Sequence, residues 1–306
     1  MTDSPPPAGS SFRIFPAHGQ AFPADDPSKP VSPEDYRAKI LPGLLTRTND
    51  KADMLYEVLV GALRIGAFDE AETGGRRLTE IDKESERSLA VLAIALMQNK
   101  KVDEAETLLR DGLAKDEAER GPAPLLHLQL AKALATKGEN DAAEDELWES
   151  LELDPNHPDA VLWWGRIAHE AEPEGGFYRA MQQIEAIEGS WFSRLWMARL
   201  HLEGQDHGSA VALYERSLPQ AAGNPEAMAM ISGDLGKAGA FQEAVRLIEP
   251  HYDPQAHGPF PGLNLAVACA KMGDKQHGRE LLGRVESLGM ELVAPQVEQV
   301  RQLLAD

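Results

Sequence analysis

The feature that most constrains this sequence is a short pattern that returns seven times, at an interval close to 34 residues. In each copy a turn residue, usually glycine, precedes a polar stretch and then a small residue within a second apolar pattern. A fixed period of this length is typical of repeat architectures, in which each unit packs only against its neighbours. The small residues are Ala71, Ala105, Ala143, Ala180, Ala210, Ala244 and Gly278, with successive gaps of 34, 38, 37, 30, 34 and 34 residues.

Each copy of the pattern predicts two antiparallel helices joined by a tight turn. Glycine at the turn accepts the left-handed backbone that ends the first helix, and the acid after it caps the second helix. A small residue then allows the two helices to pack closely. In residues 124–157, leucines recur at helical spacing on both predicted helices, and Pro155 ends the unit before Pro158 begins the next.

On these residues the sequence resembles the tetratricopeptide repeat family, most clearly in residues 124–157, 225–258 and 259–292. The stretch PDAVLWWGRIA, residues 158–168, is also similar to the opening of a family repeat. The resemblance covers roughly residues 50–292 and implies an all-α solenoid of about seven helix-turn-helix repeats with a C-terminal capping helix. It implies no particular ligand, because the family shares an architecture and not a substrate. Extra residues at 115–124 and 169–176 predict local distortion and leave the register near 172–192 open.

The two ends of the chain differ from the middle. Residues 1–33 are rich in proline, glycine and serine, and we expect a disordered arm because this composition buries too little apolar area. Residues 34–50 predict a lead-in helix interrupted by Pro42-Gly43, before a repeat array over 51–292. Residues 293–306 predict the capping helix, with Val297, Val300 and Leu304 turned inward.

Composition bounds the partners and the compartment. With 30 basic and 50 acidic residues, the formal net charge is −20, and such a surface repels phosphate backbones and anionic membranes. We therefore expect neither a nucleic-acid partner nor membrane insertion. The N-terminus lacks the basic start and apolar run of a secretion signal, so we expect a cytoplasmic protein. The only cysteine, Cys269, stands in an apolar run and is interpreted as a buried thiol.

The sequence lacks the common catalytic motifs. It contains no P-loop, no G-x-S-x-G and no H-E-x-x-H, so we expect no enzyme activity, no catalytic residue and no cofactor. The nearest approach to a metal site is His251, Asp253 and His257. We interpret that segment as a solvated loop and expect no bound metal.

The candidate partner-binding residues lie on the predicted first helices, which line the concave side of a solenoid. The stretches LWWGR (162–166) and LWMAR (195–199) are matched, and in each a tryptophan and an arginine three residues apart share a helix face. Both residue types are enriched at binding hot spots. The alternative is that the tryptophans are core residues; this is preferred for Trp164 and stays open for Trp163 and Trp196. The candidate set is Trp163, Arg166, Trp196, Arg199, Lys132 and Gln129.

The predicted inner face carries more basic than acidic residues. The expected acids are Asp53, Glu57, Asp159 and Glu203, and the expected bases are Arg64, Lys132, Arg166, Arg199, Lys237 and Lys271. This balance favours an acidic or carboxylate-bearing protein segment as partner. The alternative is that Arg64, Lys237 and Lys271 complement the dipoles of their helices. Gln129 and Lys132 do not reproduce the Lys/Asn clamp with which some tetratricopeptide modules hold a chaperone's C-terminal carboxylate.

Two functions follow from these expectations. The first is a non-enzymatic protein-interaction scaffold or adaptor that binds a partner peptide or helix in the concave groove. The alternative is a self-associating assembly protein, in which the N-terminal arm docks in its own groove or a neighbour's and gives a homo-oligomer. The arm residues expected to dock are Phe12, Ile14, Phe15 and Phe22.

Overall fold

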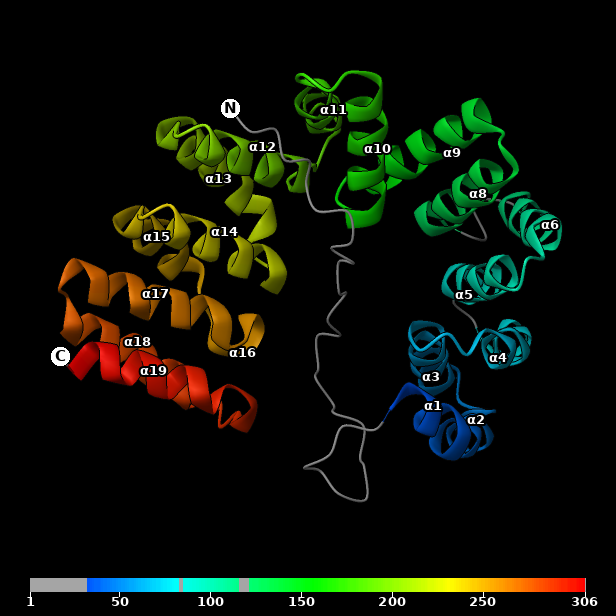
Figure 1. The fold of residues 1–306 in the computed structure, drawn as a ribbon, viewed down its shortest axis with the longest axis horizontal. Coiled ribbons are helices and arrows are strands. Elements are labelled where there is room, and N and C mark those ends of the chain that lie inside the picture. The colour runs from blue at the N-terminus through cyan, green and yellow to red at the C-terminus, as the bar shows by residue number, and fades with distance from the viewer. Residues whose placement is uncertain (1–31, 83–84, 116–120, 306) are drawn as a thin grey trace. The chain divides into compact units, whose positions relative to one another are not determined.

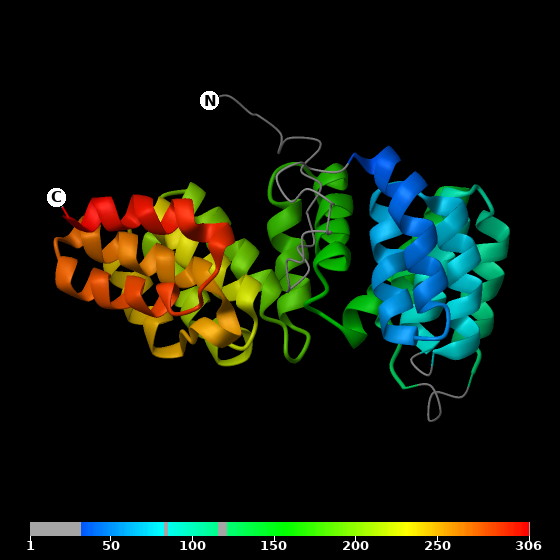
Figure 2. The same ribbon diagram turned by 90° about the horizontal axis from the view of Figure 1, so that it is seen from below.

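The computed structural model describes residues 32–82, 85–115 and 121–305. Every regular element in these residues is a helix (Figures 1 and 2), which confirms the expected all-α repeat fold. The chain divides into two compact units, residues 1–81 and residues 82–306, and each is described by itself.

The first unit holds the lead-in helix and the first helix pair. Its elements are α1 (Pro33–Asp35), a π-helical turn (Tyr36–Ile40), α2 (Leu41–Thr48), α3 (Ala52–Arg64) and α4 (Phe68–Ile81). The helix was expected to be interrupted at Pro42-Gly43, but it continues through both residues. Pro42 stands in the first turn of α2, directly after the π-helical turn, in which the Leu41 amide donates to the Tyr36 carbonyl. A wider turn accommodates a residue that has no amide proton to donate.

The second unit contains six further helix pairs and the last helix. The pairs are α5 (Ser85–Gln98) with α6 (Val102–Leu113), α8 (Pro124–Lys137) with α9 (Asn140–Leu153), α10 (Pro158–Ala171) with α11 (Gly176–Glu185), α12 (Phe192–Glu203) with α13 (His207–Ala221), α14 (Pro225–Lys237) with α15 (Phe241–Ile248), and α17 (Pro259–Met272) with α18 (Lys275–Glu286). The 3₁₀ turn Glu249–His251 and the short helix α16 (Pro254–His257) lie between the last two pairs. A second 3₁₀ turn, Glu291–Val293, follows the last pair and leads into α19 (Ala294–Ala305), which ends the unit. With α3 and α4, the described residues contain seven pairs, as the period predicts.

The seven small residues explain how each pair packs. All of them lie on the second helix of a pair, and all are buried. The one glycine among them, Gly278, is required by the last helix. A Cβ at this position would lie 2.5 Å from Leu304 Cδ2 and 3.2 Å from the Ala266 carbonyl oxygen. The absence of a Cβ at Gly278 therefore leaves room for Leu304 of α19 and for the backbone of α17.

A residue with positive φ stands in the turn of every pair, and it is not always glycine. In two turns it is Lys100 (φ 63°) and Gln205 (φ 61°), whereas the sequence places the turn glycine at Gly204. Each of these turns is closed by an amide that donates five residues back: Lys101 to Leu96 at 2.9 Å and Asp206 to His201 at 2.8 Å. These hydrogen bonds offset the left-handed backbone of a non-glycine residue.

Helix α8 is shared by two buried clusters of the second unit. Leu126, Leu130 and Leu134 belong to the cluster with α5 and α6, while Leu128 and Ala131 belong to the cluster that runs on to α19. In α19, Val297, Val300 and Leu304 are buried on the expected inward side. Cys269 is buried as predicted, and burial raises the pKa of its thiol to about 11. Among the described residues, no helix has both the length and the apolar composition to cross a bilayer.

Candidate partner-binding site

Arg199 on α12 forms a two-pronged ion pair with Asp234 on α14. Its Nε lies 2.6 Å from Asp234 Oδ2, and its Nη2 lies 3.1 Å from Oδ1. Tyr214 on α13 donates its hydroxyl to the same Oδ2 at 3.1 Å. Burial, reinforced by the Asp234 carboxylate, raises the pKa of Tyr214, so the phenol remains a donor. The guanidinium is therefore used inside the chain, and the Asp234 carboxylate that accepts from it links three helices.

Trp196 lies between this arginine and an aromatic cluster. The guanidinium carbon of Arg199 is 5.0 Å from the centroid of the Trp196 ring. Phe177 from α11 meets the same ring edge-on with centroids 5.9 Å apart, and Phe192 does so at 6.4 Å. Trp196 is half-buried and packs against the core. This placement favours the core interpretation that the sequence left open for Trp196.

Arg166 on α10 is more exposed than its counterpart Arg199 on α12. Trp163 is half-buried against the core. The Arg166 side chain is 66% exposed, and its Nε lies 3.8 Å from Glu170 Oε1, which is beyond hydrogen-bond length. Arg166 thus presents an exposed guanidinium one helical turn from an indole.

Gln129 and Lys132 share a face of α8, next to α10. Lys132 Nζ lies 3.3 Å from Asp159 Oδ2, at the start of α10. Gln129 is only 4% exposed, and its Oε1 finds no donor within the described residues. The structure therefore brings Lys132 together with an acid expected on the inner face, beside a buried acceptor. We define Gln129, Lys132, Trp163 and Arg166 as the α8–α10 face.

Further predicted bases have different surroundings. Arg64, Lys237 and Lys271 stand in the last turns of α3, α14 and α17, where a cation complements the helix dipole. The dipole interpretation therefore accounts for their positions. Asp234 was missing from the expected acids of the inner face, and it neutralises Arg199.

The His251–His257 segment is not the solvated loop that the sequence suggested. It forms a 3₁₀ turn and the one-turn helix α16, and His257 is buried. The Asp253 amide donates to His257 Nδ1 at 3.0 Å, and the His257 ring stacks on Tyr252. The described residues contain no cluster of three potential metal ligands. The arm residues Phe12, Ile14, Phe15 and Phe22 lie outside the described residues.

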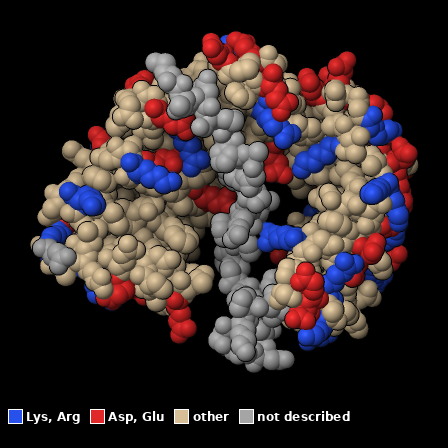
Figure 3. All heavy atoms as spheres, in the orientation of Figure 1, with Lys and Arg blue, Asp and Glu red and all other residues tan. Residues whose placement is uncertain are grey.

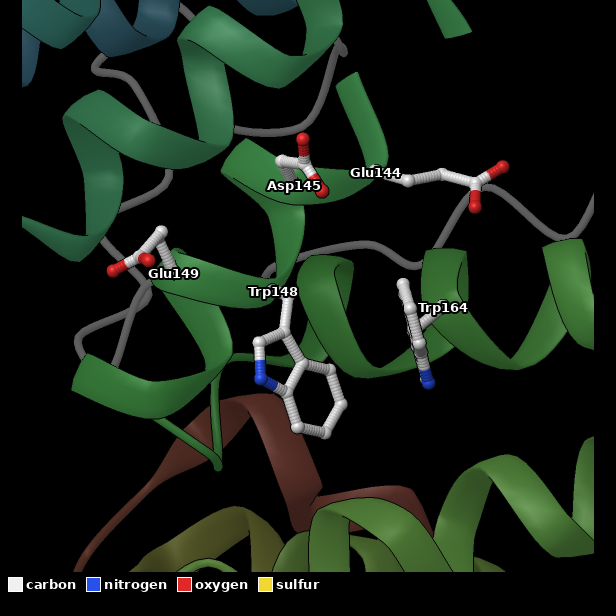
Figure 4. Close-up of a pocket in the computed structure, with 5 residues that line it drawn as sticks. All are labelled: Glu144, Asp145, Trp148, Glu149 and Trp164. Carbon is white, nitrogen blue, oxygen red and sulfur yellow. The ribbon is translucent and has the colours of Figure 1, made fainter. Parts of the chain in front are cut away.

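A second candidate site, which the sequence analysis did not find, lies between α9 and α10. Trp148 and Trp164 pack with ring centroids 5.0 Å apart and line an open depression of about 450 Å³ (Figure 4). Trp164 is half-buried and packs against the core, as Trp163 and Trp196 do, while its ring also lines this depression. The sequence contained one signal of this site, a tryptophan among closely spaced acids. Acids stand three and four residues before Trp148 and one and four residues after it, mostly on the same helix face. The other lining residues are Glu144, Asp145 and Glu149.

Comparisons with known proteins concern the architecture only. No protein-family model and no curated protein matches this sequence. A tetratricopeptide repeat protein from Parabacteroides merdae is 13% identical, with a TM-score of 0.34, over 83% of this chain and 99% of that chain. A monomeric mutant of IFIT1 with Gppp-AAAA is 15% identical, with a TM-score of 0.34, over 89% of this chain and 67% of that one. The human IFIT1 dimer with PPP-AAAA is 14% identical, with a TM-score of 0.29, over 85% and 69%.

These TM-scores are low, and the assignment of the fold rests on the chain's own seven helix pairs. Their phased small residues and left-handed turns are those of tetratricopeptide-type repeats. The resemblance expected from the sequence is confirmed at the level of the fold.

Proposed function

We propose that this repeat protein is a non-enzymatic scaffold that holds a segment of another protein on the α8–α10 face. The observation that carries the proposal is the exposed guanidinium of Arg166, one helical turn from Trp163. Its nearest carboxylate among the described residues, that of Glu170, lies beyond hydrogen-bond length. A carboxylate from a bound segment would supply the missing partner.

The neighbouring side chains support an acidic or carboxylate-bearing segment. Arg166 is exposed and offers a planar fork that suits a carboxylate, and Trp163 provides apolar surface one turn away. A carboxylate of the partner would also compete with Asp159 for Lys132. The face is narrower than the set expected from the sequence, because Asp234 occupies Arg199 and Trp196 lies in the aromatic cluster.

The test is affinity capture from the native cell, with bound proteins identified by mass spectrometry. We expect Lys132→Ala, Trp163→Ala and Arg166→Ala to lose one common set of proteins while keeping the wild-type circular dichroism spectrum. Arg246→Ala on α15 is the matched control, because that arginine is exposed to a similar degree and faces one surface glutamate, as Arg166 does. Retention of the whole set by all three variants would refute the proposal.

Two further predictions concern nucleic acid and self-association. The acidic surface predicts that nuclease treatment of the captured material leaves the bound proteins unchanged. For the self-association alternative, a chain that lacks residues 1–33 should elute as a smaller oligomer in size-exclusion chromatography. An unchanged elution position would remove that alternative.

A further inference from the structure

The depression between α9 and α10 combines two indole rings with carboxylates. Trp148 projects from α9 and Trp164 from α10, and their rings meet at an interplanar angle of 50° (Figure 4). Glu144, Asp145 and Glu149 line the same depression from α9. Aromatic faces carry negative charge density, so rings and carboxylates together favour a cation.

The two rings are held in place by their own nitrogen atoms. Trp148 Nε1 donates to Glu152 Oε1 at 2.7 Å, and Trp164 Nε1 donates to Gln183 Oε1 at 3.1 Å. These hydrogen bonds fix the orientation of each ring before any ligand arrives. A ligand that stacks on a fixed ring loses less conformational entropy than one that must order it.

The carboxylates of the depression are not neutralised by the described residues. Glu144, Asp145 and Glu149 form no ion pair within residues 32–82, 85–115 and 121–305. Other acids nearby are paired, since Glu146 contacts His127 and Asp159 contacts Lys132.

Helix α9 as a whole has six acidic residues and no basic one. Acidic side chains accordingly gather over α9 in the view of Figure 3. Its six acids extend from Asp141 to Glu152, a rise of roughly 16 Å at the helical pitch. This length exceeds a single side chain, so it fits several basic residues in one segment better than a small isolated cation.

We propose that this depression is a second binding site, which receives an arginine or lysine side chain from a basic segment of a protein partner. The aliphatic stem of that side chain lies against the indoles, and its charged end meets Glu144, Asp145 or Glu149. Flanking basic residues of the segment pair with the other acids of α9. The site is separate from the α8–α10 face, and it selects the opposite charge.

A synthetic probe tests the site directly. An arginine–glycine alternating nonapeptide with a fluorophore is titrated with the full chain, and binding is followed by anisotropy at low and near-physiological salt. We expect saturable binding that Trp148→Leu weakens roughly threefold to thirtyfold, the range for one cation–aromatic contact. The triple variant Glu144→Gln, Asp145→Asn, Glu149→Gln should weaken it further.

Two controls separate the site from general acidity. The matched triple variant Asp111→Asn, Glu203→Gln, Glu226→Gln removes as many exposed carboxylates elsewhere and should bind the peptide as the wild type does. Lys132→Ala should also leave peptide binding unchanged, so this test and the test of the α8–α10 face fail independently. Circular dichroism checks that Trp148→Leu folds. If it does not, the triple variant of Glu144, Asp145 and Glu149, whose side chains are exposed, tests the site instead.

Three results would overturn the proposal. The first is no saturable binding of the peptide by the wild type. The second is an equal loss of affinity in the pocket triple variant and the matched triple variant, which would mean charge attraction without a site. The third is tighter binding of tetramethylammonium than of the peptide, which would assign the depression to a small cation.

Discussion

The α10 motif, Leu162–Arg166, and the α12 motif, Leu195–Arg199, share a sequence pattern but not their surroundings. In the α12 motif the arginine pairs with Asp234 and stacks on its own tryptophan. In the α10 motif the arginine is exposed and has only a distant glutamate. One motif has become a link between helices, whereas the other leaves its cation available.

The next repeat produces this difference. Asp234 stands 35 residues after Arg199, on the first helix of the following pair. The residue at the same separation from Arg166 is His201, which is occupied by Tyr178 and Asp206 at 3.1 Å each. A single residue in the neighbouring unit therefore accounts for whether the arginine of the motif is paired, as Arg199 is, or exposed, as Arg166 is.

Removal of Asp234, the acid that pairs with the α12 motif, should have the largest effect on stability. Asp234→Ala leaves Arg199 and the Tyr214 hydroxyl without their common acceptor in a partly buried position. We expect a loss of about 2–4 kcal/mol in the free energy of unfolding, measured by urea denaturation. Glu170→Ala, the corresponding change beside Arg166, should cost less than about 0.5 kcal/mol, because that pair is exposed. Equal costs for the two variants would contradict the comparison.

The two motifs also differ in the residue before the arginine, which is Gly165 in one and alanine in the other. A Cβ at Gly165 would lie 2.5 Å and 2.7 Å from two ring carbons of Phe177. Gly165→Ala should therefore destabilise the protein by about 1–3 kcal/mol in thermal or urea unfolding. Gly236→Ala on α14 is the matched control, since its Cβ meets nothing within 4 Å and alanine favours the helix. A Gly165→Ala protein as stable as the wild type would show that Phe177 relaxes freely.

The period and the glycine turns are sufficient to predict most of the fold. Ala71 and its six counterparts are phased by chain geometry, and burial of a small residue at every crossing follows directly. The π-helical turn before Pro42 could not be predicted, because proline is compatible with several local solutions. The left-handed backbone of Lys100 and Gln205 could not be predicted for a similar reason, since turn hydrogen bonds can support a left-handed residue of almost any type.

The candidate site was less predictable, because its chemistry depends on side chains from different repeats. The sequence placed Trp196 and Arg199 on one helix face, but it gave no indication that Asp234 pairs with that arginine. It assigned Trp164 to the core, against which this residue does pack, but it gave no indication of the contact with Trp148 from the preceding unit. Periodicity predicts which face a residue occupies, and only packing determines which residue of the next helix meets it.

The histidine before α10 predicts a pH dependence of the protein's stability. Burial lowers the pKa of His157, the residue before α10, although the carboxylates of Asp159 and Asp154 oppose the shift. A lowered pKa means that folding favours the neutral imidazole, so this stability is present above the ordinary pKa of 6.5 and is lost as the pH falls below it. We expect His157→Asn to lose less stability than the wild type between neutral pH and pH about 5.5, in parallel urea titrations. Equal slopes would show that His157 does not contribute.

The arginines of the two motifs should differ in what their removal changes, and Arg166→Ala has the smallest expected effect on stability. Arg166→Ala should change the free energy of unfolding by less than about 0.5 kcal/mol, since the side chain is exposed and its ion pair is long. The same substitution should abolish capture of the partner if the α8–α10 face binds it. Arg199→Ala should show the converse, with lower stability but capture by the fraction that remains folded. Capture that depended on Arg199 and not on Arg166, at equal folded concentration, would mean that the ion pair with Asp234 opens for a ligand.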